Sequence, residues 1–220
     1  MATDNLFKLE NFNPLSNCTF INDEQLVREE LKAINTVLTP DLFKNVLQEA
    51  LIDTQNLRAP TAPKSAFKNI ISSSVVTFLR NKLVPYGWTS YEGRGDISFT
   101  ITPNKTNAIY VTLGNEDVGK KKGHPTNSAK KGSELSKAHS DPQFYFDQHT
   151  KIYILLLHFD SDKLNIELSI PRNFSKGHVE EWEKRIILPT FNYNTFSSNT
   201  IAQLPKPAQI DNGLIKRKSL

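Results

Sequence analysis

Residues 151–170 read KIYILLLHFDSDKLNIELSI, and this stretch decides the class of the fold. Its first half, Lys151–Phe159, is almost continuously apolar, as expected for a central strand that is buried on both faces. After the turn residues Asp160–Lys163, apolar and polar residues alternate from Leu164 to Ile170, which is the period of a strand with one buried face. The two halves therefore predict a β-hairpin inside a sheet.

A second hairpin is predicted upstream of the first. Apolar and hydroxyl residues alternate over Ile97–Ile101, Pro103–Asn107 supplies turn residues, and Ala108–Leu113 supplies the returning strand. Downstream of residue 170 the pattern is weaker. There we predict a short helix at Gly177–Lys184 and a strand at Arg185–Leu188.

Three amphipathic helices are predicted before the hairpin at residues 97–113. Asn22 and Asp23 are suited to cap a helix that ends near Pro40. Asp41–Asp53 and Ser65–Leu83 then carry apolar residues at the i, i+3, i+4 spacing of a helix with one buried face. Helices followed by hairpins predict an α+β fold.

The predicted architecture is α+β, with N-terminal helices followed by a mainly antiparallel sheet of four to six strands and a long basic loop insertion. We divide the chain into a helical section at residues 1–60 and an α+β core at 61–190, which includes the basic loop 114–141. Residues 191–220 are rich in Asn, Ser, Thr and Pro and end in a basic run, and they predict an extended or disordered arm.

The basic loop is the strongest indication of function. Loops longer than about 12–15 residues inside a compact domain are usually functional or disordered. Lysines on a Gly-containing loop suit a polyanion backbone, because point charges displace condensed counterions without needing a fixed geometry. The alternative is a mobile, solvated loop. The residues predicted to contact nucleic acid are Arg94, Lys120, Lys121, Lys122, Lys130 and Lys131.

Composition limits the possible partners and compartments. The formal net charge is +4 and the pI is near 9.0, which suits an acidic partner. With Cys18 as the single cysteine, the chain has no internal disulfide and no Cys/His zinc motif. The N-terminus lacks the pattern of a signal peptide, and no apolar run is long enough for a membrane helix. We therefore expect a cytoplasmic protein that does not enter a membrane.

The order of helix, strand opened by Asp96, and hairpin partner strand resembles the start of restriction-endonuclease-like nuclease cores. The resemblance implies a Mg²⁺-dependent endonuclease of a restriction system, in which two carboxylates hold the metal ion and a lysine orients the water. On this basis Asp96 is an expected metal ligand. Alternation of strand faces adds Glu116, just past the polar row of the next strand, as a second ligand and Glu167, on the polar face of a later strand, as a further catalytic carboxylate. The family's acidic-x-Lys triplet is missing, because Thr112-Leu113-Gly114 stands in its place. The alternative is that each carboxylate lies on a solvated surface.

Two functional hypotheses follow. The first is a nucleic-acid-binding protein, for double-stranded DNA in preference to RNA, that is a restriction-type nuclease or a relative of one and is compatible with a homodimer. The second is a non-enzymatic protein-interaction module, a bacterial or phage inhibitor or adaptor, that docks through its lysine loop. The aromatic run Phe144, Tyr145 and Phe146 suits either base stacking or a buried sheet edge, and the latter is favoured.

Overall fold

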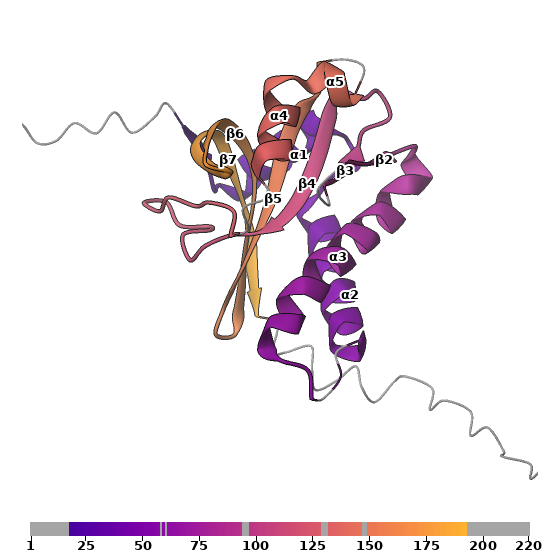
Figure 1. The fold of residues 1–220 in the computed structure, drawn as a ribbon, viewed down its shortest axis with the longest axis vertical. Helices are drawn as coiled ribbons and strands as arrows, with labels where there is room; N and C mark the ends of the chain where they lie inside the picture. Colours follow the sequence, from indigo (N-terminus) through magenta and orange to yellow (C-terminus); the bar gives the residue numbers. More distant parts are fainter. Residues whose placement is uncertain are drawn as a thin grey trace, which may run out of the picture.

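The computed structural model describes residues 18–57, 59, 61–93, 97–128, 132–146 and 149–192, and a mixed seven-stranded sheet runs through them (Figure 1). The strand order across the sheet is β1-β7-β6-β5-β4-β3-β2. The strands are β1 (Thr19–Ile21), β2 (Thr89–Glu92), β3 (Ser98–Ile101), β4 (Asn107–Leu113), β5 (Lys151–Asp160), β6 (Lys163–Ser175) and β7 (His178–Asn192).

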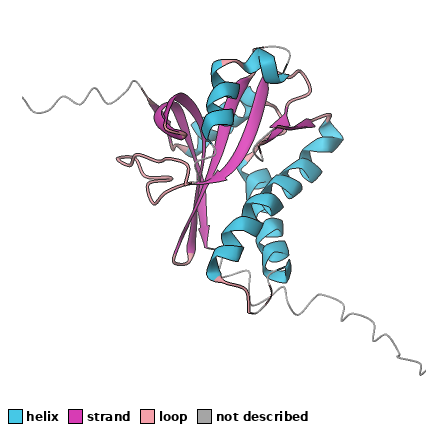
Figure 2. Ribbon diagram, viewed as in Figure 1, coloured by secondary structure: helices cyan, strands magenta, loops and turns pink. Residues whose placement is uncertain are grey.

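Helices cover both faces of this sheet (Figure 2). The helices α1, α2 and α3 pack in one core with the side chains of Ile109 and Val111 on β4. The helices α4 and α5 pack in the other core with Ala108 and Tyr110, which alternate with the first pair along the same strand. The helices are α1 (Glu24–Ile34), α2 (Pro40–Leu57), α3 (Lys64–Leu83), the 3₁₀ turn η1 (Val84–Tyr86), α4 (Gly132–Ser140) and α5 (Pro142–Phe146).

The three helices predicted before the hairpin at residues 97–113 are present, but the first ends at Ile34 and not near Pro40. Asp23 caps α1, because its Oδ1 accepts hydrogen bonds from the amides of Gln25 and Leu26 at 3.0 and 3.1 Å. The buried residues of α2 include Phe43 and Val46 at helical spacing. No helix in the described ranges has the length and apolar character needed to cross a bilayer.

The α+β class is confirmed, but the finer description of the sheet is wrong. The sheet has seven strands and is mixed, since β4 pairs parallel with β5 and β1 pairs parallel with β7. The first parallel pair arises because α4 and α5 carry the chain back before β5 begins, so part of the expected loop 114–141 is helical. The order of helices and strands also differs, because β1 precedes α1.

The predicted helix in the region after residue 176 is also wrong, whereas the predicted strand is present as part of a longer one. The predicted helix at Gly177–Lys184 and strand at Arg185–Leu188 are parts of one long strand, β7, which continues to Asn192 in the predicted arm. Val179 and Trp182 are three residues apart, a spacing that also places two residues on one face of a helix. They share one core because the pairing of β6 with β7 is irregular between Ile170 and Phe174, which shifts the alternation of faces. The rest of the predicted arm lies outside the described residues.

Tyr153 makes the stability of the fold sensitive to alkaline pH. It is 8% exposed, and burial, with smaller contributions from Glu30 and Glu183, raises its pKa to about 12. Its contribution to stability is therefore complete below the unfolded pKa of about 10 and is lost as pH rises through about 12. We expect Tyr153→Phe to lose less stability than the wild type over this pH window. Urea denaturation at about pH 9 and about pH 11.5 measures the difference, and equal losses in both proteins would contradict it.

Candidate nucleic-acid interface

Residues 114–128, which we call the lysine loop, leave the end of β4 and project from the sheet at the left of Figure 1. Lys120, Lys121 and Lys122 are exposed on it. The Lys120 side chain is 57% exposed and its Nζ lies 3.8 Å from Oδ1 of Asp117. Within the described part of the chain, Lys121 and Lys122 form no ion pair. The loop thus presents three adjacent ammonium groups to solvent.

The lysine loop is held together by hydrogen bonds between its own residues. The side chain of Asn115 bridges the loop, since Nδ2 donates to the carbonyl of His124 at 3.1 Å and Oδ1 accepts from the amide of Thr126 at 3.2 Å. The His124 amide also donates to Oδ2 of Asp117 at 3.0 Å. These contacts give the loop a defined shape without regular secondary structure.

The last residues of the lysine loop are bound to the curled end of the β6–β7 hairpin. The Val179 amide donates to Oδ1 of Asn127 at 2.9 Å, and the Thr126 hydroxyl donates to the Val179 carbonyl at 3.1 Å. The buried indole of Trp182 donates from Nε1 to the carbonyl of Pro125 at 2.7 Å. Trp182 therefore fixes the end of the lysine loop to β7.

A buried ion pair lies beneath the lysine loop. Arg185 donates from Nη2 to Oε2 of Glu167 at 2.6 Å and from Nε to Oε1 at 3.2 Å, and the two residues are 4% and 0% exposed. The same pair reaches the loop. Oε2 of Glu167 accepts from the Gly119 amide at 2.8 Å, and Nη1 of Arg185 donates to the Gly123 carbonyl at 3.2 Å. Both carboxylate oxygens of Glu167 and all three guanidinium nitrogens of Arg185 thus take part in hydrogen bonds.

Strand β1 borders this ion pair. The guanidinium of Arg185 lies 5.3 Å from the centroid of the Phe20 ring, within range of a cation–π interaction. Cys18 is half-buried nearby. Burial raises the pKa of its thiol, and the charge of Arg185 opposes that shift while the charge of Glu167 adds to it. The thiol is accordingly a small, neutral neighbour of the pair.

The carboxylates expected at a metal site do not share one environment in the described residues. Glu116 is exposed on the lysine loop, whereas Glu167 is fully buried and bound to Arg185. Asp96 and Arg94 lie outside the described residues. No three His, Cys, Asp or Glu side chains in the described ranges are grouped so that they could hold a metal ion. The Glu167 oxygens accept hydrogen bonds from Arg185 and Gly119, so the surroundings of Glu167 do not fit Mg²⁺. We therefore assign no chemical step to a metal ion.

The remaining basic and aromatic predictions also differ in outcome. Lys130 and Lys131 lie outside the described residues. Phe146 is 3% exposed and packs against Phe99 with ring centroids 5.1 Å apart, so the buried interpretation is confirmed for this residue. The Tyr145 hydroxyl donates to Oε2 of Glu134 at 2.9 Å.

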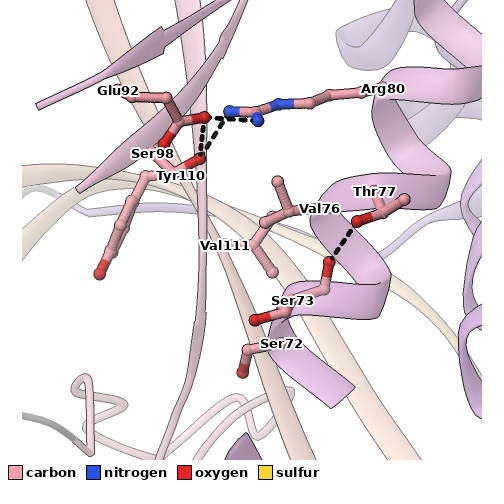
Figure 3. Close-up of a pocket in the computed structure, with 9 residues that line it drawn as sticks. All are labelled: Ser72, Ser73, Val76, Thr77, Arg80, Glu92, Ser98, Tyr110 and Val111. Atoms are coloured by element: carbon pink, nitrogen blue, oxygen red, sulfur yellow. Dashed lines mark hydrogen bonds and ion pairs between the residues drawn. The ribbon is translucent and has the colours of Figure 1, made fainter. Parts of the chain in front are cut away.

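A polar cleft between α3 and strands β2 to β4 was not predicted from the sequence (Figure 3). It has a volume of about 470 Å³, and Arg80 lies at one end. Arg80 donates to Oε1 of Glu92 and to Oγ of Ser98, both at 2.5 Å, and to the Phe99 carbonyl at 3.1 Å. Arg80 therefore links α3 to the edge of the sheet. Its position within a helix gave no sequence signal for these partners, because they lie on strands distant in sequence.

Comparison of the chain with protein-family models, curated proteins and solved structures finds no match. The function is therefore argued from the geometry of the described residues.

Proposed function

We propose that this protein binds the phosphate backbone of double-stranded DNA through its lysine loop. The observation that carries the proposal is the exposure of Lys120, Lys121 and Lys122 side by side on a loop with defined internal hydrogen bonds. Each lysine that neutralises a phosphate releases cations condensed on the DNA, and this release favours binding through a gain of entropy. Backbone contacts of this kind position a protein on DNA without reading its sequence.

The packing of the aromatic residues favours duplex over single-stranded nucleic acid. Binding of single strands relies on rings that stack on unpaired bases. The ring of Phe146 is enclosed by Phe99 and Tyr91 in the core between α5 and the sheet, and Tyr145 packs edge-on against Tyr91. The Phe146 ring is 3% exposed and therefore belongs to the core, where bases cannot reach it. A charge-based contact with a duplex backbone needs no such rings.

A second candidate function is Mg²⁺-dependent cleavage of the bound DNA. Its support is the order of a helix, a strand and a hairpin partner strand in the sequence, on which the resemblance to restriction-endonuclease-like cores rests. Such an activity would use Asp96, which follows from that resemblance, and Glu116, which follows from its place just past the polar row of the next strand. Cleavage is therefore measured together with binding.

We expect the triple variant Lys120→Gln/Lys121→Gln/Lys122→Gln to bind duplex DNA more weakly and with a smaller dependence on salt. Each lost phosphate contact lowers the slope of log K against log salt by about 0.9, so the slope should fall by about 2 to 3. Fluorescence anisotropy with a labelled duplex over a series of salt concentrations gives the slope. A gel of the same mixtures, with and without Mg²⁺, reports cleavage.

The matched control is Lys32→Gln/Lys44→Gln/Lys68→Gln. These exposed lysines lie on α1, α2 and α3, on the other side of the sheet. Each triple variant removes three positive charges, so both formal net charges fall from +4 to +1. An equal loss in both variants would mean that net charge, not the lysine loop, causes binding. Absence of binding and cleavage by the wild type would instead favour the protein-interaction hypothesis.

A further inference from the structure

We infer that the buried Glu167–Arg185 ion pair positions the lysine triplet and that phosphate binding depends on this anchor. The inference rests on the proposed function and identifies residues that serve it without touching DNA. The triplet Lys120–Lys122 is bracketed by two glycines, and each glycine is held by one partner of the ion pair. Glu167 accepts from the Gly119 amide at 2.8 Å, and Arg185 donates to the Gly123 carbonyl at 3.2 Å.

The anchor is rigid because of where its two residues lie. Glu167 and Arg185 belong to the neighbouring strands β6 and β7, and β5 and β1 flank these strands on their outer sides. Both side chains are buried, and each makes hydrogen bonds to the other and to the loop. The ends of the triplet are therefore fixed to the centre of the sheet and not to another loop.

This arrangement favours binding because the loop is ordered before DNA arrives. Fixing the backbone of a residue costs conformational entropy, and a mobile loop would incur that cost during binding. In this protein the cost is met during folding. Preorganisation of this kind strengthens binding without adding a contact to the ligand.

The two glycines allow the geometry to be changed while every charge is kept. Gly119 has a φ of 81°, which is unfavourable for a residue with a side chain. A Cβ on Gly123 would lie 2.7 Å from Cβ and 2.9 Å from the carbonyl oxygen of Asp117. Alanine at position 123 must therefore displace the loop where Arg185 holds it. The three lysines and the net charge remain unchanged.

The test compares Gly119→Ala and Gly123→Ala with Gly87→Ala in the full chain. Gly87 is a matched control because its φ is 80° and its Cβ would meet only Pro103, at 3.5 Å, at the end of η1. We expect Gly123→Ala to bind a labelled duplex about tenfold more weakly at low salt, which corresponds to about 1.4 kcal/mol. Gly119→Ala should weaken binding in the same direction, and Gly87→Ala should bind as the wild type does. Hydrogen exchange of the Gly119 amide, followed by NMR, should be slow in the wild type and fast in Gly123→Ala.

Three results would overturn the inference. Rapid exchange of the Gly119 amide in the wild type would show that the anchor is not formed, even if the lysines bind DNA. Equal affinities of Gly123→Ala and Gly87→Ala, at a lower melting temperature for the first, would show a structural role alone. A wild type that lacks salt-dependent affinity for DNA would remove the proposed function itself, and with it this inference. The last result differs from the other two because in it the wild type fails to bind DNA, whereas the other two can appear while the wild type still binds.

Discussion

Replacement of Glu167 by leucine is expected to lower the free energy of unfolding by about 3–5 kcal/mol, because it leaves a buried guanidinium without its carboxylate. Arg185 is 4% exposed, and the Glu167 side chain accepts two of its hydrogen bonds. The Gly119 amide loses its acceptor in the same variant. Domains of this size usually have a free energy of unfolding of about 5–15 kcal/mol, so the variant would lose a large part of its stability. Urea denaturation at neutral pH measures the change.

Glu183→Leu is the matched control for this prediction. Glu183 also lies on β7, but its side chain is 49% exposed and its Lys151 partner is 3.5 Å away. Exposed pairs of this kind contribute about 0–1 kcal/mol. The double variant Glu167→Leu/Arg185→Leu should recover most of the lost stability, because it removes both charges together. A cost for Glu167→Leu as small as that for Glu183→Leu would refute a structural role for the pair.

Strands β4 to β7 show how much of the fold can be predicted from the sequence alone. The hairpin at residues 151–170 was predicted because the continuous apolar run of its first strand and the alternation of its second report directly on burial. Its partners were not, since β4 and β5 are parallel and the sequence does not record which strands become neighbours after a crossover. Only the part of β7 at Arg185–Leu188 was predicted as a strand, because an irregular pairing near Pro171 breaks the two-residue period in the first half of β7.

The candidate site was predicted in part, for a related reason. The exposed lysines were found because a cluster of charge is a local feature of the sequence. The anchor beneath them was not, because the distance from Gly119 to Glu167 and from Gly123 to Arg185 along the chain conceals their contacts. Glu167 was assigned to chemistry as a polar residue on a strand face. The partner that gives it another role, Arg185, lies on the strand whose pairing the sequence did not reveal.

Phe146→Ala is expected to lower the free energy of unfolding by about 3–5 kcal/mol, as is typical when a buried phenylalanine is truncated to alanine. The ring is 3% exposed and lies at the centre of an aromatic cluster, with centroids 5.1 Å from Phe99 and 5.9 Å from Tyr91. Its removal leaves a cavity between α5 and the sheet that neighbouring strands cannot readily fill. Urea denaturation of Phe146→Ala and of the wild type at one pH gives the difference.

The informative comparison is with Tyr86→Ala, an aromatic residue on η1 that is 58% exposed. Truncation of an exposed side chain usually changes stability by no more than about 0.5 kcal/mol. Binding separates the two possible roles of Phe146 further. If its ring stacked on bases, Phe146→Ala would lose affinity for single-stranded DNA under conditions in which the variant is fully folded. If the ring belongs to the core, as its contacts indicate, the folded variant should keep its affinity for the duplex, because the lysine loop and its anchor on β6 and β7 remain in place.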